Sequence, residues 1–217
     1  MARIHATYLR ENMKNLLLVS AVAMMACACG GGGGNEGDPK APGFSAPVNK
    51  LAAYVGTWAA TCNDHAVDNA TITSTGNNTV TIATRTDYYA QANCTGAIIA
   101  TETEGADITA TYVDTVDAPV VFATGTPATT GKVDRITASM PIHSRSITGT
   151  AVTRVVQNGK PQWCIDFGNG RSTCILDEGA YSARSGVAGG LLLQGNAFYE
   201  LVPNGTVYEA YGRYVKK

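Results

Sequence analysis

Short runs of strand-forming residues, separated by turn residues, dominate the sequence from residue 57 onward. Thr, Val, Ile and Tyr recur in these runs, and strong turn signals stand at 76–78, 158–160 and 203–205. Apart from a short helical turn expected at 48–54, this part shows no helical period. The pattern predicts an all-β fold, a single antiparallel barrel or sandwich of short strands. The expected strands are 57–62, 70–75, 79–89, 97–103, 108–114, 120–123, 132–140, 148–156, 162–167, 173–176, 197–202 and 206–215.

The composition excludes several classes of protein. Apolar residues make up 45% of the chain, so the strand-rich part can bury a core and is not a disordered segment. The net charge is −1 and charged residues make up 15%, so nothing indicates a nucleic-acid partner. Residues 49–217 have the length of one domain, and we expect a single β domain there.

The N-terminal segment has the features of a secretory signal. An apolar stretch at 16–26 follows Lys14, and small residues and two cysteines come next. We therefore expect residues 1–28 to be a signal peptide. An alternative start at Met13 stays open, because Met13-Lys14-Asn15 resembles a conventional beginning. An uncleaved membrane anchor is disfavoured, since a spanning helix needs about 20 mainly apolar residues and glycines interrupt the stretch here.

The cysteines after the apolar stretch resemble the lipobox of bacterial lipoproteins. In that family the cysteine receives diacylglycerol and the chain is cut just before it. Cys27 follows Met24-Met25-Ala26, which offers the bulky residue, whereas Cys29 follows small residues and precedes a run of glycines. We favour Cys29 as the lipid-attachment residue, with Cys27 as the alternative. In this family an aspartate after the cysteine tends to retain the protein in the inner membrane, so Gly30 points to the outer one.

Residues 29–48 are rich in Gly, Pro, Asn, Lys and Asp and have one aromatic residue, Phe44. Such a segment cannot bury enough surface to fold alone, so we expect a flexible tether. The resemblance then implies a β domain held at a membrane by its N-terminal lipid, on the periplasmic side or at the cell surface.

Four cysteines remain in the body: Cys62, Cys94, Cys164 and Cys174. An even number in an exported chain indicates two disulfides, and three pairings are possible. We favour the pairing of neighbours in sequence, Cys62–Cys94 and Cys164–Cys174. A zinc site is the alternative to two disulfides, but the Cys-x-x-Cys spacing of zinc sites does not occur and histidine is scarce.

The second pair has a geometric reason. Residues 163–175 resemble a hairpin around Asn169-Gly170. A two-residue turn there would set Cys164 opposite Ile175, whereas a three-residue loop from Gly168 to Gly170, with Gly170 left-handed, would set it opposite Cys174. The disulfide therefore predicts the three-residue loop.

Gly56-Thr57-Trp58 at the first strand resembles the Gly-x-Trp opening of lipocalins, fatty-acid-binding proteins and avidins. In those calycin barrels the tryptophan closes one end and packs under an arginine of the last strand. The resemblance implies a calycin-like barrel, in which Arg213 would cover Trp58 by a cation–π contact of about 1 kcal/mol. Another barrel or a sandwich, with Trp58 as an ordinary core residue, stays open.

The remaining polar groups suggest no catalytic or metal site. His65 lies near Asp64 and Asp68, which we interpret as a solvated turn rather than a base or metal site. His143, Ser144 and Arg145 are interpreted as a polar loop. Asp177 and Glu178 are adjacent, so on a strand their side chains would point apart and could not form a glycosidase pair. Asp166 and Glu200 remain conceivable partners, but only folding could bring them together.

These observations support a membrane-anchored, non-enzymatic binding or interaction module, without cofactor. The partner would be a protein or other macromolecule. A calycin-like carrier of a small apolar ligand is the main alternative, and an envelope hydrolase is the remote one.

The lipid anchor is directly testable. Replacing both Cys27 and Cys29 by serine should release the protein from membranes, because no acyl chain can then be attached. Membrane sedimentation measures this, and the mass of the N-terminal lipopeptide of the unsubstituted protein identifies the cysteine. Continued sedimentation of the double variant would contradict the lipoprotein interpretation.

Overall fold

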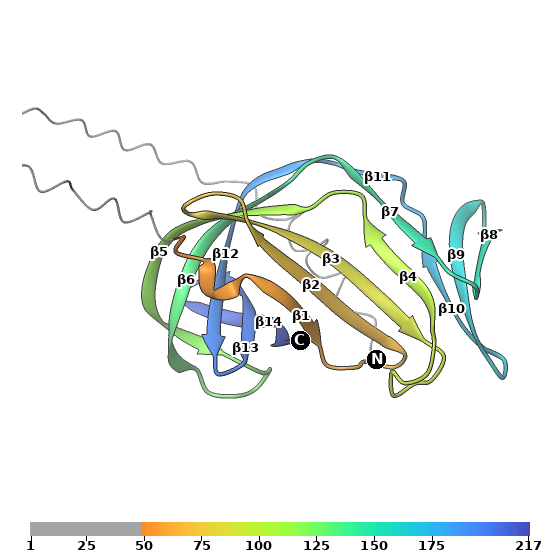
Figure 1. Ribbon diagram of the computed structural model, residues 1–217, viewed down its shortest axis with the longest axis horizontal. Helices are drawn as coiled ribbons and strands as arrows, with labels where there is room; N and C mark the ends of the chain where they lie inside the picture. The colour runs from red at the N-terminus through yellow and green to blue at the C-terminus, as the bar shows by residue number, and fades with distance from the viewer. Residues whose placement is uncertain (1–48) are drawn as a thin grey trace, which may run out of the picture. The chain divides into compact units, whose positions relative to one another are not determined.

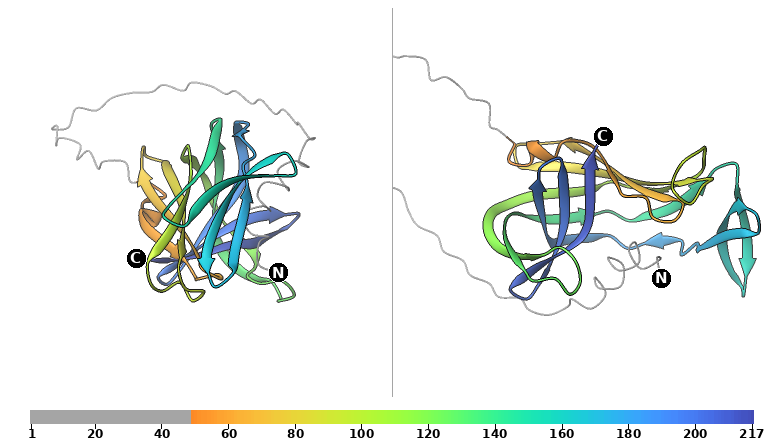
Figure 2. Two further views of the ribbon diagram at one scale, coloured as in Figure 1. Left: turned by 90° about the vertical axis from the view of Figure 1, so that its right-hand side faces the viewer. Right: turned by 90° about the horizontal axis from the view of Figure 1, so that it is seen from below.

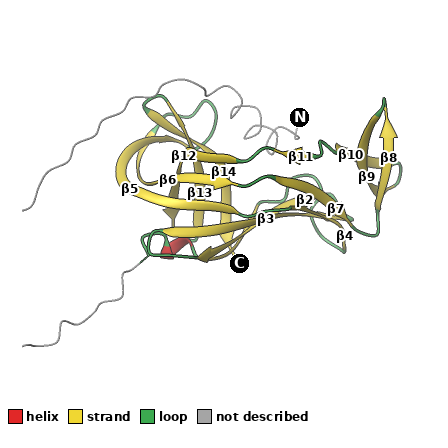
Figure 3. Ribbon diagram, turned by 90° about the horizontal axis from the view of Figure 1, so that it is seen from above, coloured by secondary structure: helices red, strands yellow, loops and turns green. Residues whose placement is uncertain are grey.

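The structure is a computed structural model, and it describes residues 49–217, which belong to one compact unit. One 3-10 turn precedes fourteen strands, as Figure 3 shows by colour. The all-β prediction is confirmed, and so is a helical turn before the first strand. The elements are η1 Ala52–Tyr54, β1 Gly56–Ala60, β2 Ala66–Ser74, β3 Thr79–Tyr89, β4 Ile98–Glu104, β5 Ile108–Val121, β6 Thr129–Met140, β7 His143–Thr148, β8 Val152–Gln157, β9 Lys160–Gly168, β10 Arg171–Leu176, β11 Ala180–Tyr181, β12 Arg184–Gln194, β13 Ala197–Asn204 and β14 Val207–Lys216.

Eight strands of the large sheet form a ring of pairings (Figure 1). Followed along the chain, β1, β2, β3, β5, β6, β12, β13 and β14 each pair antiparallel with the next one. The last strand, β14, then pairs with the first, with Trp58 opposite Lys216 and Ala60 opposite Tyr214. We call these strands the eight-strand ring. Its closure removes the open edges that a flat sheet would expose.

Two insertions interrupt the ring. The first half of β3 pairs with β5, whereas its second half pairs with β4, which follows β3 in the chain. β7 and β11 extend the sheet beyond β4, and the segment from β7 to β11 also carries a separate sheet of β8, β9 and β10. Figures 1 and 2 show this small sheet beside the ends of β4 and β7, far from the β5–β6 hairpin. Ile165 of the small sheet packs with Tyr88, Ala100 and Ile147 of the large one.

Aromatic side chains fill one end of the ring. The Trp58 ring meets the Phe198 ring edge-on at 5.0 Å between centroids, and the Tyr214 ring stacks on Phe198 at 4.9 Å. Tyr54 lies beneath them, with its carbonyl accepting a 2.7 Å hydrogen bond from Trp58 Nε1. We call these four residues the aromatic floor. Trp58 is only 1% exposed, so its indole contributes several kcal/mol to the core.

The cation beside the Trp58 ring is Lys216, so the expectation that Arg213 covers Trp58 is wrong. Lys216 Nζ lies 5.3 Å from the Trp58 ring centroid, since register sets the two residues opposite each other. Arg213 is three residues earlier and therefore points to the other face of β14. There its Nε donates a 3.2 Å hydrogen bond to Tyr199 Oη.

A second core lies behind β12. Leu191 and Leu192 are adjacent and therefore point to opposite faces of β12, yet both are buried. Leu191 packs with the aromatic floor. Leu192 packs in the second core, with Val120, Val133 and Leu201. The end of β5 covers this second core, and Val120 and Val121 pair in parallel with the start of β14. Gly190 allows the close packing, because a Cβ there would lie 2.6 Å from Val133 Cγ1.

Both predicted disulfides are present, Cys62–Cys94 and Cys164–Cys174. Cys164 lies directly opposite Cys174, as expected, but the predicted three-residue loop is wrong. Arg171 pairs with Gly168, so the loop is the two-residue Asn169-Gly170, and a bulge beside Gly168 restores the register. Gly170 is left-handed, as predicted, with φ of 72°.

The sequence contains two tryptophans, which provide a matched test of the floor. Trp58→Ala should lower the free energy of unfolding by about 3–5 kcal/mol, because it empties the ring interior. Trp163→Ala, on the partly buried face of the small sheet, should cost about 1–2 kcal/mol. Guanidinium unfolding followed by far-UV circular dichroism measures both, and equal losses would show that Trp58 has no special place in the core.

Candidate functional site

The two lipid-attachment candidates, Cys27 and Cys29, lie outside the described residues, as do the signal and tether. Within residues 49–217, no group of three or more His, Cys, Asp or Glu side chains is placed to hold a metal ion. No helix of this part is long and apolar enough to cross a membrane. One group of polar side chains, around the buried Asp87 and Asn69, lies on the outer face of the large sheet, and two others lie on its inner surface.

Register explains why they gather there. On β3, Thr86 and Tyr88 share a face with the core residues Val80 and Ile82, because side chains two apart point the same way. Thr86 pairs with Glu102 of β4, and Glu102 in turn with Ile147 of β7. The inner surface of the ring thus continues beyond the aromatic floor as a surface lined by charged and polar side chains. We call the part on β4, β7 and β11 the charged wall: Glu102, Glu104, His143, Arg145 and Tyr181.

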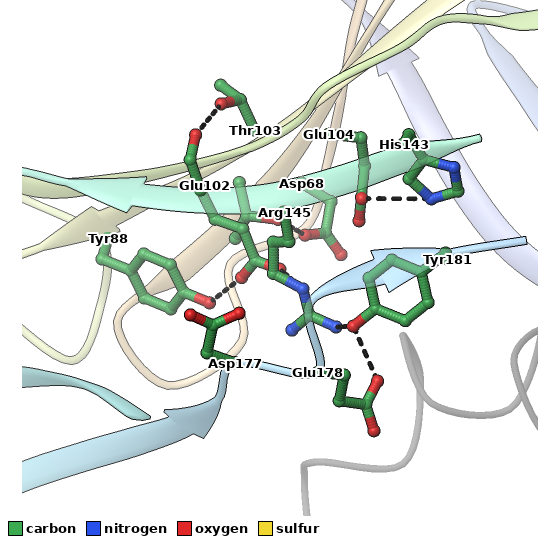
Figure 4. Close-up of polar contacts among 12 residues, drawn as sticks. Asp68, Tyr88, Glu102, Thr103, Glu104, His143, Arg145, Asp177, Glu178 and Tyr181 are labelled. Carbon is green, nitrogen blue, oxygen red and sulfur yellow. Dashed lines mark hydrogen bonds and ion pairs between the residues drawn. The ribbon is translucent and has the colours of Figure 1, made fainter. Parts of the chain in front are cut away.

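Arg145 is the centre of the charged wall, and Figure 4 shows it between Glu102 and Tyr181. Its Nε lies 3.1 Å from Glu102 Oε1, and its Nη2 donates a 3.0 Å hydrogen bond to Tyr181 Oη. The side chains of Arg145 and Glu102 are only 9% and 12% exposed. Tyr88 Oη donates to the other oxygen of Glu102 at 2.7 Å. A buried ion pair with both partners hydrogen-bonded holds its geometry firmly.

His143 forms the outer end of the wall. Its Nε2 lies 3.5 Å from Glu104 Oε2, and its ring stacks on Tyr181 at 5.2 Å. Tyr181 Oη donates to Glu178 at 2.6 Å. The prediction of a polar loop is wrong here, because His143 and Arg145 lie on β7, where they point inward on the same face as the buried Ile147.

A second group of inward residues lies nearer the aromatic floor. Asp68 of β2 accepts a 2.6 Å hydrogen bond from Thr86 Oγ1. Glu200 of β13 pairs with Leu191 and Gly212, so it faces the ring interior with Leu191. Burial raises the pKa of Glu200 to about 7, and the negative charge of Asp68 adds to the effect. We call Asp68 and Glu200 the acid pair.

The floor and the acid pair are electrostatically linked through Tyr214. Burial raises the pKa of the Tyr214 hydroxyl, and the charges of Glu200 and Asp68 raise it further. The Tyr214 phenol is therefore protonated at neutral pH.

The other groups considered from sequence stay apart from this surface. His65 is buried, not a solvated turn: its ring stacks on Phe167 at 4.0 Å and its Nδ1 lies 2.8 Å from the Tyr89 carbonyl. Asp177 and Glu178 follow β10 outside any strand, and Asp177 pairs with Arg154. Asp166 accepts a hydrogen bond from Gly168 N on the small sheet, so it does not meet Glu200.

Comparison with family models, curated proteins and solved structures finds no significant match. The geometry of the inner surface therefore carries the functional argument.

The raised pKa of Glu200 makes a prediction about stability. In the unfolded chain this carboxyl ionises near its ordinary value of 4.5, and in the folded protein near 7. The folded state thus binds the proton more tightly, and stability falls as the pH rises from 4.5 to 7. Glu200→Gln removes this loss and should be more stable than the unsubstituted protein by about 1–3 kcal/mol at pH 8, with no difference at pH 4.5. 

Urea unfolding at the two pH values measures the difference. Asp107→Asn is the control, since Asp107 is an exposed carboxylate and its replacement should not change the pH dependence. An equal effect of pH on both variants would contradict the assignment of the raised pKa to Glu200.

Proposed function

We propose that this chain is a lipid-anchored protein of the bacterial cell envelope whose β domain is a non-catalytic binding module. The lipobox-like signal motivates the anchor and the outer-membrane location. Two disulfides support an exported protein, because such bonds persist in oxidising compartments.

We further propose that the eight-strand ring is a small calycin-like barrel. Its strands pair in chain order and its last strand pairs with its first. A helical turn and Gly56-x-Trp58 open β1, and a cation of the last strand covers the tryptophan, with Lys216 instead of Arg213 in that role. In barrels of eight strands the interior is wide enough to be filled by side chains or to hold one small ligand.

The observation that carries the proposal is the division of the inner surface. One end is filled by the aromatic floor, whereas the other presents the acid pair and the charged wall. The Glu102–Arg145 ion pair is held in place by Tyr88 and Tyr181, so this end presents fixed charged and hydrogen-bonding groups to a partner. A binding module that recognises a polar or charged partner at this end fits the arrangement.

The floor argues against the alternative of a carrier for a small apolar ligand. Tyr54, Trp58 and Phe198 are each at most 3% exposed and occupy the space that such a ligand would need.

Native mass spectrometry of the full chain tests the proposal. The protein is purified from membranes in mild detergent, and one half is unfolded and refolded to strip any bound molecule. We expect the untreated half to carry a non-covalent mass beyond polypeptide and lipid, and the refolded half to regain it from an envelope extract. Identical masses before and after, with nothing gained from the extract, would contradict the binding module.

A further inference from the structure

The Cys164–Cys174 disulfide fixes the register of a hairpin that has a second register available. Within residues 49–217, β10 pairs with β9 alone, because it is an outer strand of the small sheet. β9 is held from both sides, since β8 pairs with it along six residues. β10 can therefore slide along β9 without breaking a pairing between any other two strands.

The present register contains a bulge that the turn does not require. The turn 169–170 has positive φ at both residues, as two-residue hairpins of type I′ demand. Continued without interruption, such a hairpin sets Cys164 opposite Ile175. The bulge directly after the turn shifts the pairing by one residue, so that Cys164 lies opposite Cys174. A bulge leaves one residue of its strand unpaired, so the disulfide, and not the turn, selects this register.

The residues of β10 and of the segment after it also fit the other register. In the present one Ile175 packs in the core that the two sheets share, and Asp177 pairs with Arg154. A slip of β10 by one residue toward the turn places Leu176 where Ile175 now lies. Glu178 likewise takes the place of Asp177, beside Arg154. An aliphatic side chain thus replaces an aliphatic one, and an acid replaces an acid.

The disulfide is open to attack by a reductant. Cys164 and Cys174 lie on the face of the small sheet that points away from the buried Ile165, and both are partly exposed. A dithiol attacks one sulfur and then resolves the mixed disulfide, which transfers two electrons and two protons. Both cysteines are left as thiols, and the dithiol becomes a disulfide. The constraint that selects the bulged register is then gone.

The slip reaches the charged wall through Glu178. Tyr181 Oη donates a 2.6 Å hydrogen bond to Glu178, and it accepts one of 3.0 Å from Arg145 Nη2 (Figure 4). One residue of slip moves a strand by about 3.3 Å along its axis. Glu178 is thereby drawn from Tyr181 toward Arg154, which changes the contacts that hold the Arg145 guanidinium in the wall.

We propose that the Cys164–Cys174 disulfide is a redox switch of the charged wall. Oxidised, it holds the bulged register and keeps Glu178 on Tyr181. Reduced by a dithiol, it lets β10 take the register without a bulge, in which Glu178 lies beside Arg154. The regulation of binding rests on the proposed function, whereas the change of register needs no ligand.

The first test is whether a dithiol opens the bond in the folded protein. The full chain in detergent micelles is treated with dithiothreitol and then with iodoacetamide. Peptide mass spectrometry should find both Cys164 and Cys174 alkylated, while far-UV circular dichroism keeps the signal of a folded β protein. Alkylation that appears only when this signal is lost would overturn the proposal.

The second test measures the register by NMR contacts between Hα protons. Residues opposite each other in a non-hydrogen-bonded pair have Cα atoms about 4.5 Å apart, so their Hα protons are in contact. The oxidised protein should show this contact between positions 164 and 174. The double variant Cys164→Ser, Cys174→Ser imitates the reduced state without touching the other disulfide. It should lose that contact and gain one between positions 165 and 174.

Deletion of Gly168 from the double variant is the matched control. With one residue fewer before the turn, a hairpin without a bulge already sets position 164 opposite position 174. This variant should therefore keep the contact of the oxidised protein. The proposal fails if the double variant also keeps it, or if the deletion changes the register in the same way. A change of register in a protein that carries no bound mass would support the switch and contradict only the proposed binding function.

Discussion

The antiparallel pairing of β1 with β14 is the constraint on which the structure depends. Only three residue pairs, from Trp58–Lys216 to Ala60–Tyr214, join the first strand of the ring to the last. They turn a meandering sheet into a ring with an inside and an outside. Once that pairing is made, Trp58 has no other place than the interior, and Phe198 and Tyr214 meet it there. The pairings of Glu200 with Leu191 and Gly212 direct its carboxylate into the same interior.

Much of the fold could be predicted from sequence, because strand composition and turn residues are local. The two disulfides followed from spacing and hairpin geometry. β12 was missed, since glycines at 186, 189 and 190 lower its strand propensity, and it forms because neighbours pair on both sides. β7 was missed for a different reason. Two of its three inward side chains, His143 and Arg145, are polar or charged, so the apolar alternation that marks a strand is broken.

The inner polar surface could not be predicted, because its contacts join residues far apart in the chain. Glu102 of β4 meets Arg145 of β7, and Asp68 of β2 and Glu200 of β13 share the inner face although they are 132 positions apart in the chain. A single sequence carries no local pattern that indicates contacts between residues so far apart. A cation on the Trp58 ring could be predicted from sequence, but Arg213 was the wrong residue. The sequence alone does not give the register that sets Lys216 opposite Trp58. One residue of register decides which side chain faces inward.

The segment between β6 and β12 leaves the eight-strand ring and returns to it at one point. Met140, the last residue of β6, pairs with Arg184, the first of β12, although 43 residues, 141–183, lie between them in the chain. The whole excursion, small sheet and disulfide included, is therefore a cassette mounted on a framework whose closure does not involve it. The β1–β14 pairing that closes the ring places no constraint on the length of this cassette, whereas Ile165 ties its small sheet to Tyr88 of β3. A change of length in the hairpin turns of the small sheet would thus leave the pairings of the ring as they are.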